Sequence, residues 1–194
     1  MGTPDRILDA ALVSFGSRGY GATSLDGLAA ELGVTKQTIL YHFGSKEGVL
    51  EAVIDRASAD LTAALQSTLA QARSGWDRVE AVVRTVFRLG LQRPELPGLI
   101  REVTRLGPPS STRLAEALEP LLDAARTSLE REMEAGTIRT TDARLLLVSL
   151  YSTVIGAVTE VEVLRAVGVE PTARTAVRRR RELLDFLHAA LRAA

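Results

Sequence analysis

Apolar residues recur every three or four positions along most of this chain, which is the spacing of one face of an α-helix. The first such stripe runs from Ile7 to Phe15, and it follows Thr3 and Pro4, residue types that suit the first positions of a helix. No stretch alternates with a period of two for long enough to predict a strand. The sequence therefore predicts an all-α fold.

Capping residues and helix breakers divide this pattern into about nine helices. Thr23 or Ser24, Thr35 and Ser45 can each cap a helix, and glycines and prolines separate the later segments. The predicted helices span about 3–15, 25–32, 36–43, 46–73, 76–92, 94–106, 111–135, 142–167 and 172 to Ala193. At ~1.5 Å per residue the fourth is roughly 40 Å long, enough to link two parts of the molecule.

Composition narrows the possible functions. Hydrophobic residues make up 46% of the 194 residues, so the chain can bury a substantial core. Twenty-four basic residues balance twenty-four acidic ones, so any attraction to nucleic acid must be local. The absence of cysteine excludes disulfides and thiolate chemistry, and His42 and His188 lie too far apart for a metal-ligand spacing. No GxSxG, HExxH, P-loop or dinucleotide motif is present, so we expect neither an enzyme nor a bound metal or cofactor.

The sequence also bears on the compartment. The amino-terminal stretch has no apolar run after basic residues and resembles no secretory signal. The longest uncharged apolar run, Leu145 to Thr159, has 15 residues. A membrane-spanning helix needs ~20. We therefore expect a soluble cytoplasmic protein that does not enter a membrane.

The spacing of Ala29, Gly33 and Ile39 predicts a helix-turn-helix. A small alanine lets two helices approach each other, and glycine permits the left-handed turn between them. The isoleucine then packs the second helix inward. This arrangement places the second helix at the surface of the amino-terminal segment.

The outward face of that second helix carries Gln37, Thr38 and Tyr41, with Lys36 and His42 towards its edges. The stretch from residue 33 to residue 46 contains two lysines and one histidine but no acidic residue. Attraction to phosphate is therefore focused on this helix and on the start of the next. A DNA groove is the surface that such a face suits.

The segment RILDAALVSFGSRGYGATSLDGLAAELGVTKQTILYHFGSKEGVL resembles the tetracycline-repressor (TetR) family of bacterial transcription regulators. The resemblance covers roughly residues 4–56. It implies an all-helical homodimer in which each three-helix head reads half of a double-stranded DNA operator. Residues 1–47 would form the helix-turn-helix DNA-binding domain, and residues 48–194 the effector-binding and dimerisation domain.

The resemblance also implies DNA contacts, which fall on Thr23, Thr35, Lys36, Gln37, Thr38, Tyr41, His42 and Lys46. Lys36, Gln37 and Tyr41 would face base edges or nearby backbone, whereas Thr23, Thr38, His42 and Lys46 would grip phosphates. Many members have tyrosine directly after the inward residue, where this chain has Leu40, so one hydroxyl–phosphate contact is missing. The alternative for Tyr41 and His42 is that they cover the core with a polar tip in water.

A small-molecule effector is expected to bind among the helices from Trp76 to Met133 and the inner face of residues 142–167. The candidate pocket walls are Phe87, Leu91, Ile100, Leu122, Tyr151 and Val154, and the candidate charged groups are Arg101, Glu102 and Arg105. The charged residues lie in a short, proline-bounded, mostly apolar segment that could force them inward. The alternative is that they are solvated.

Two apolar helices near the carboxyl end predict a four-helix interface across a two-fold axis. The candidate interface residues are Leu147, Leu150, Val154, Val177, Leu184, Leu187 and Leu191. The alternative is that the first of these helices is an internal core helix. The run from Arg178 to Arg181 points around the whole helix, which predicts a solvated face with one arginine at an interface.

These features predict a transcriptional repressor that is released from a pseudo-palindromic operator by a small-molecule effector. The alternative is a DNA-bound structural or interaction protein of the same fold that has no effector.

Overall fold

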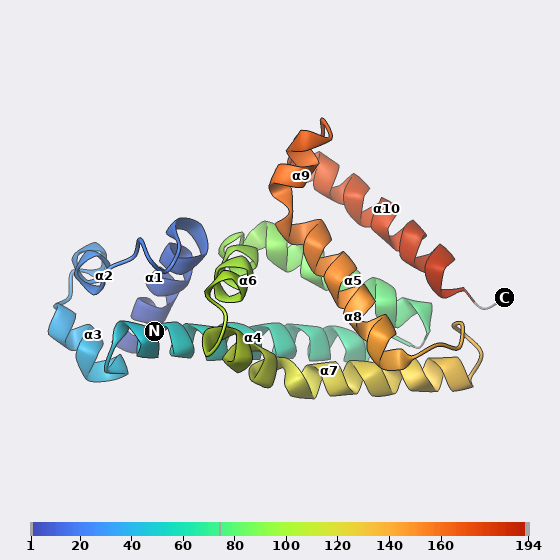
Figure 1. Cartoon of the computed structure of the whole chain (residues 1–194), viewed down its shortest axis with the longest axis horizontal. Helices are drawn as coiled ribbons and strands as arrows, with labels where there is room; N and C mark the ends of the chain where they lie inside the picture. The colour runs from blue at the N-terminus through green and yellow to red at the C-terminus, as the bar shows by residue number, and fades with distance from the viewer. Residues whose placement is uncertain (1, 74, 193–194) are drawn as a thin grey trace. The chain divides into compact units, whose positions relative to one another are not determined.

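The structure, a computed structural model, describes residues 2–73 and 75–192 (Figure 1). Within these ranges the chain forms ten helices and no strand, which confirms the predicted all-α fold. The helices are α1 (Thr3–Arg18), α2 (Leu25–Leu32), α3 (Lys36–Phe43), α4 (Lys46–Gln71), α5 (Trp76–Gln92), α6 (Glu95–Leu106), α7 (Ser110–Glu134), α8 (Ala143–Thr159), α9 (Val161–Ala166) and α10 (Ala173–Leu191).

The predicted helix over residues 142–167 is two helices, which is why ten are found instead of about nine. Glu160 leaves the helical conformation, with φ −86° and ψ 65°, and separates α8 from α9. A carboxylate is unfavourable at the carboxyl end of one helix and favourable at the amino end of the next. The predicted end of the last helix, Ala193, lies outside the described residues.

The chain divides into two compact units. The first contains residues 1–61 and 93–118, and the second contains residues 62–92 and 119–194. Helices α4 and α7 each contribute residues to both units. Each unit has a hydrophobic core of its own.

The core of the first unit is formed by α1, α2, α3, the start of α4, and α6. Its fully buried side chains include Ile7, Phe15, Leu28, Ile39 and Ile54. Residues far apart in the chain therefore share one core with the helix-turn-helix segment. Figure 1 shows α2 and α3 following α1 at the blue end of the chain.

Helices α1 and α6 cross at two glycines. A Cβ atom built on Gly98 would lie 2.0 Å from the carbonyl oxygen of Gly16, and one built on Gly16 would lie 2.2 Å from the carbonyl oxygen of Glu95. Since neither backbone can accept a side chain at this crossing, glycine is required at both positions. The close approach fixes α6 against the amino-terminal helix.

The second unit packs α5 against α8 and α10. One cluster of its core contains Val83, Phe87, Val154 and Leu187, and a second cluster contains Leu129, Ile138, Leu146 and Leu191. In the described ranges no helix is both long enough and apolar enough to cross a membrane.

Candidate nucleic-acid interface

Two side-chain caps and one glycine build the helix-turn-helix. The Ser24 hydroxyl accepts a hydrogen bond from the backbone N–H of Gly27 at 3.0 Å, which caps α2. The Thr35 hydroxyl accepts from the backbone N–H of Thr38 at 3.1 Å, which caps α3. Between the helices, Gly33 adopts a left-handed conformation with φ 67° and ψ 32°. The predicted helix-turn-helix is therefore present, with its elements where the spacing placed them.

Helix α3 has one buried side and one exposed side. Ile39 is fully buried in the core of the first unit, and Leu40 and Phe43 pack against that core while half-buried. Gln37 is exposed, and Tyr41 is 85% exposed. Tyr41 therefore does not cover the core of its own unit, whereas Leu40, the residue that departs from the family pattern, does.

Tyr41 and His42 form an edge-to-face aromatic pair on this exposed side. Their ring centroids are 5.3 Å apart, and the ring planes are at 75°. Such pairs are weakly attractive and restrict the orientation of both rings. The exposed side of α3 therefore presents a partly ordered aromatic and amide surface with hydrogen-bonding groups at its edge.

Lys36 lies at the amino end of α3 and pairs with Asp26 of α2 at 2.9 Å. Both side chains are substantially exposed, at 44% and 71%. An exposed ion pair of this kind contributes only about 0 to 1 kcal/mol, so the ammonium group can exchange Asp26 for a phosphate at little cost.

Lys46, at the start of α4, is held more firmly. Its Nζ donates a hydrogen bond to the backbone carbonyl of Tyr20 at 2.6 Å and lies 4.1 Å from the centroid of the Tyr20 ring. The Tyr20 hydroxyl donates to Glu47 at 2.8 Å. Burial, together with Glu47, raises the pKa of Tyr20. Hydrogen bonds from its own backbone N–H and from Tyr20 lower the pKa of Glu47. Lys46 thus joins the start of α4 to the turn between α1 and α2.

The remaining predicted DNA contacts differ in exposure. Thr35 and His42 are exposed, and Thr38 is half-buried, with its hydroxyl 2.9 Å from that of Thr35. Thr23 is only 3% exposed, and its hydroxyl donates to the backbone carbonyl of Gly19 at 2.9 Å. The Thr23 hydroxyl therefore holds the turn before α2.

Sequence reasoning missed the role of Glu102 in this unit. Its carboxylate is buried and accepts a hydrogen bond from the backbone N–H of Tyr20 at 2.7 Å. Arg105 binds both carboxylate oxygens, at 2.9 and 2.7 Å. The hydrogen bonds from Arg105 lower the pKa of Glu102, and burial opposes that shift. Helix α6 is thereby tied to the turn that precedes the helix-turn-helix.

The predicted pocket residues are divided between the two units. Ile100, Arg101, Glu102 and Arg105 lie on α6 in the first unit. Phe87, Leu91, Leu122, Tyr151 and Val154 belong to the second unit, where Phe87 and Val154 are buried in the core.

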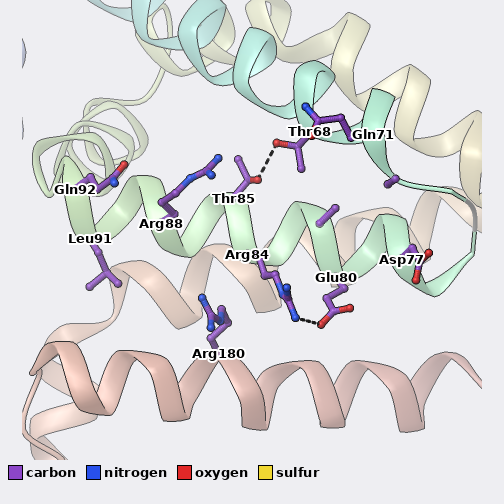
Figure 2. Close-up of a pocket in the computed structure, with 12 residues that line it drawn as sticks. Thr68, Gln71, Asp77, Glu80, Arg84, Thr85, Arg88, Leu91, Gln92 and Arg180 are labelled. Carbon is purple, nitrogen blue, oxygen red and sulfur yellow. Dashed lines mark hydrogen bonds and ion pairs between the residues drawn. The ribbon is translucent and has the colours of Figure 1, made fainter.

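A groove of about 670 Å³ lies in the second unit (Figure 2). Of the predicted pocket residues only Leu91 lines it. Its other lining residues are Thr68, Gln71, Ala72, Asp77, Glu80, Ala81, Arg84, Thr85, Arg88, Gln92 and Arg180. Several follow each other at helical spacing on the polar face of α5, a pattern that normally indicates only a solvated face.

The predicted interface residues lie mostly within the chain's own core. Val154, Leu184, Leu187 and Leu191 are buried, and Leu147 and Leu150 pack half-buried against them. Only Val177 is exposed, at 54%. The apolar residues that α8 does expose are Leu145, Val148 and Tyr151, at 69%, 62% and 41%. Phe186 of α10 is 60% exposed.

The fold and this surface define a class: an all-helical protein with a helix-turn-helix DNA-binding segment at its amino end. Residues 7–53 match the family model described as bacterial regulatory proteins, tetR family. The biofilm operon icaADBC HTH-type negative transcriptional regulator IcaR of Staphylococcus aureus is 38% identical over 47 residues, which cover 24% of this chain and 25% of IcaR. The HTH-type transcriptional regulatory protein RaaS of Mycobacterium tuberculosis is 28% identical over 135 residues, covering 69% of this chain and 58% of RaaS. The likeness to the tetR family that this model describes lies in residues 7–53.

Solved structures extend the likeness of fold to nearly the whole chain. The transcriptional regulator FadR from Bacillus subtilis, in complex with stearoyl-CoA, is similar with a TM-score of 0.81 and 19% identity, covering 94% of this chain and 96% of FadR. A transcriptional regulator from Saccharomonospora viridis, in complex with choline, has a TM-score of 0.80 and 21% identity, covering 97% of this chain and 96% of its own.

Proposed function

We propose that this protein is a transcriptional repressor that occupies a DNA operator through α3 and leaves it when a small-molecule effector binds. The observation that carries the proposal is the division of α3: Ile39 is fully buried, whereas Tyr41, two positions later, is 85% exposed. A recognition helix needs this arrangement, because one side must be fixed by the core while the other enters the major groove. The name of IcaR as a negative regulator supports repression.

The proposed contacts follow the exposure of the side chains. Gln37 and Tyr41 would face base edges, with Lys36 at the rim of the groove, since amide and hydroxyl groups can read the donors and acceptors of base pairs. Thr35, Thr38, His42 and Lys46 would contact phosphates. Thr23 would reach a phosphate only if its hydroxyl left the carbonyl of Gly19. We therefore assign Thr23 to positioning the turn.

We propose that two copies of the chain bind one operator. The exposed apolar residues Leu145 and Val148 on α8, with Val177 on α10, supply a face that a second copy would cover. Two α3 helices would then enter successive major grooves of a pseudo-palindrome about 34 to 36 Å apart. In this arrangement residues 1–47 read DNA, and residues 48–194 dimerise and bind the effector.

The effector would bind in the second unit. FadR holds stearoyl-CoA and the Saccharomonospora viridis regulator holds choline, so proteins of this fold take small molecules. These two ligands carry opposite charges, and the sign of the effector's charge must therefore be read from this chain's own residues. Helix α4, which contains residues of both units, would carry the response towards the head.

Selection from a library of random DNA duplexes tests the proposal. We expect the protein to enrich one pseudo-palindromic sequence and to bind it more tightly than a scrambled duplex of the same composition. Specific sites are typically bound at least about 10³-fold more tightly than non-specific DNA. Enrichment of no sequence would contradict the proposal. Enrichment of a sequence whose complex no small molecule releases would favour the rival, a DNA-bound interaction protein without an effector.

A further inference from the structure

The groove of the second unit gathers three arginines from two helices. Arg84 and Arg88 lie one turn apart on α5, and Arg180 reaches the same groove from α10. Figure 2 shows Arg84 and Arg180 between these two helices, and Arg88 beside Thr85. Like charges one turn apart on a helix repel each other, so this grouping is unfavourable without a compensating charge.

The carboxylates that line the groove compensate only part of this charge. Glu80 pairs with Arg84 at 2.5 Å. Asp77 lies 3.9 Å from Arg73, which does not line the groove. Across the described residues, 2–73 and 75–192, neither Arg88 nor Arg180 forms a hydrogen bond or an ion pair. Two guanidinium groups of one groove are therefore left with unused donors.

Arg180 is distinguished from the other members of its run. Arg178 and Arg181 are exposed on α10, whereas Arg179 and Arg180 are half-buried. Arg179 donates to the backbone carbonyl of Ala157, so its guanidinium already has a partner. Arg180 alone among the four lines the groove. The arginine run thus contributes one side chain to this surface, held by the partial burial of its stem.

The rest of the lining suits an organic molecule. Leu91, Ala72 and Ala81 provide apolar surface, and Gln71 and Gln92 provide polar side chains near the ends of α4 and α5. A volume of about 670 Å³ lies within the usual range for small-molecule sites. Thr68 and Thr85 hydrogen-bond to each other at 3.1 Å and join α4 to α5 along one wall.

We propose that this groove binds a small organic anion, a phosphate or a carboxylate attached to an apolar group, with Arg88 and Arg180 holding the anionic end. Guanidinium groups form forked, charge-assisted hydrogen bonds with both kinds of anion. The apolar part would lie against Leu91, which is one turn from Arg88 on α5. The proposal names the chemical class of the effector, and to that extent it rests on the proposed function.

Isothermal titration calorimetry of the full chain with hexyl phosphate, hexanoate, 1-hexanol and hexyltrimethylammonium tests the site. These probes share one alkyl chain and differ in charge. We expect at least one of the two anions to bind, and the neutral and cationic probes to bind at least about tenfold more weakly, the loss that one charge-assisted hydrogen bond accounts for. The stronger anion then distinguishes a phosphate ligand from a carboxylate ligand.

Variants locate the binding. Arg88→Gln and Arg180→Gln should each weaken the anion at least about tenfold. Arg178→Gln, an exposed arginine of the same helix outside the groove, should leave its affinity unchanged. Circular dichroism melts of all three variants should match wild type because the substituted side chains lie outside the core. Binding of neither anion, equal binding of 1-hexanol, or full affinity in the Arg88 and Arg180 variants would each overturn the assignment.

Duplex binding is measured separately in the absence of any probe. If the protein binds the anion through Arg88 and Arg180 but enriches no duplex, the result supports the anion site in the groove and contradicts the repressor function. If the protein enriches an operator but binds neither anion, the result supports DNA binding and contradicts the anion site in the groove.

Discussion

Lys46 shows how one side chain can serve both the fold and a phosphate contact. Its ammonium group donates to the Tyr20 carbonyl and lies over the Tyr20 ring, at the amino end of α4. An ammonium group has three donors, so it can keep the carbonyl and still meet a phosphate oxygen. Truncating the whole side chain would mix the two effects, and a variant that keeps the aliphatic stem separates them better.

Lys46→Met should weaken binding to every duplex by a similar factor, because phosphate contacts carry no sequence information. The slope of the logarithm of affinity against the logarithm of salt concentration should fall by about 0.9, the value for one phosphate. Fluorescence anisotropy titrations at several salt concentrations measure both effects. Arg73→Met, which removes an exposed charge from the second unit, is the control and should leave the slope unchanged. An unchanged slope for Lys46→Met would remove Lys46 from the contact map.

Glu102 gives a prediction about pH. Its pKa is lowered in the folded protein, chiefly by the hydrogen bonds from Arg105. A lowered folded-state pKa means that the ionised carboxylate stabilises the fold above its unfolded pKa of about 4.3, and that this contribution is lost as the pH falls through the folded value. Glu102→Gln should therefore flatten the decline in stability between neutral and acidic pH.

Urea unfolding at a series of pH values measures this dependence. Arg105→Gln should flatten the decline as well, because it removes the other partner of the same pair. The double variant should add little to either single variant, as expected for residues that act through one interaction. A Glu102→Gln variant whose stability falls with pH as steeply as wild type would show that this carboxylate is not the titrating group.

For single residues, the sequence predicted the features that depend on near neighbours in the chain, and it missed contacts between residues far apart in the chain. The exposure of Gln37 and the burial of Ile39 follow from helical spacing within a few residues. The hydrogen bond from Tyr20 to Glu102 joins residues that are 82 positions apart, and no pattern in the sequence marks such a pair. Glu102 was expected in an effector pocket only because its segment is short and mostly apolar.

At the scale of elements, the crossing of α1 and α6 limits what the first unit can accept. Gly98→Ala would place a methyl group 2.0 Å from the Gly16 carbonyl oxygen, so the two helices would have to move apart. We expect a loss of about 1 to 3 kcal/mol in the free energy of unfolding, the usual range for overpacking. Gly21→Ala is the control, since nothing lies within 4 Å of its added methyl group.

Chemical denaturation of both variants and wild type measures this loss. A Gly98→Ala variant as stable as Gly21→Ala would mean that the helices do not cross as closely as the structure shows. The same crossing explains why the sequence did not predict the partner of α1. Glycine in a helix is read as a weak position or a break, and its value for close packing becomes visible only when the second helix is placed.

Helix ends were predicted where a residue type with a clear local effect marks them. Such residues are Ser24, Thr35 and Gly33, and α2 and α3 begin and end as expected. The break between α8 and α9 falls at Glu160, with neither glycine nor proline beside it. Glu160 and Glu162 stand in a long apolar pattern, and two glutamates are too weak a signal to divide a helix.

At the scale of the whole molecule, the apolar face of α8 bears on assembly. Leu145 and Val148 are one turn apart and more than 60% exposed, which is unusual for apolar residues of a monomer when they adjoin further apolar surface. The sequence predicted an interface on the same two helices as the proposal, but on side chains that mostly fill the chain's own core. Periodicity identifies an apolar helix, and it does not distinguish which apolar side meets the same chain.

The double substitution Leu145→Glu, Val148→Glu should shift the protein from dimer to monomer, because a second copy would have to bury two unpaired carboxylates. Sedimentation velocity at a fixed protein concentration measures the change. Val13→Glu, which alters an exposed apolar residue of the first unit, should leave the assembly unchanged. A monomeric wild type, or a dimer that tolerates both glutamates, would contradict the proposed assembly.

The exposed side of α3 is tested most directly by the sequence that the protein selects. Duplex selection should be carried out in parallel with wild type, with Gln37→Ala, Tyr41→Ala combined, and with a control, Gln66→Ala, on the exposed side of α4. We predict that wild type and the control enrich the same pseudo-palindrome, and that the α3 variant loses preference at base pairs within each half-site, at about 1 to 3 kcal/mol for each lost base contact. An α3 variant that selects the same sequence with undiminished preference would contradict the account.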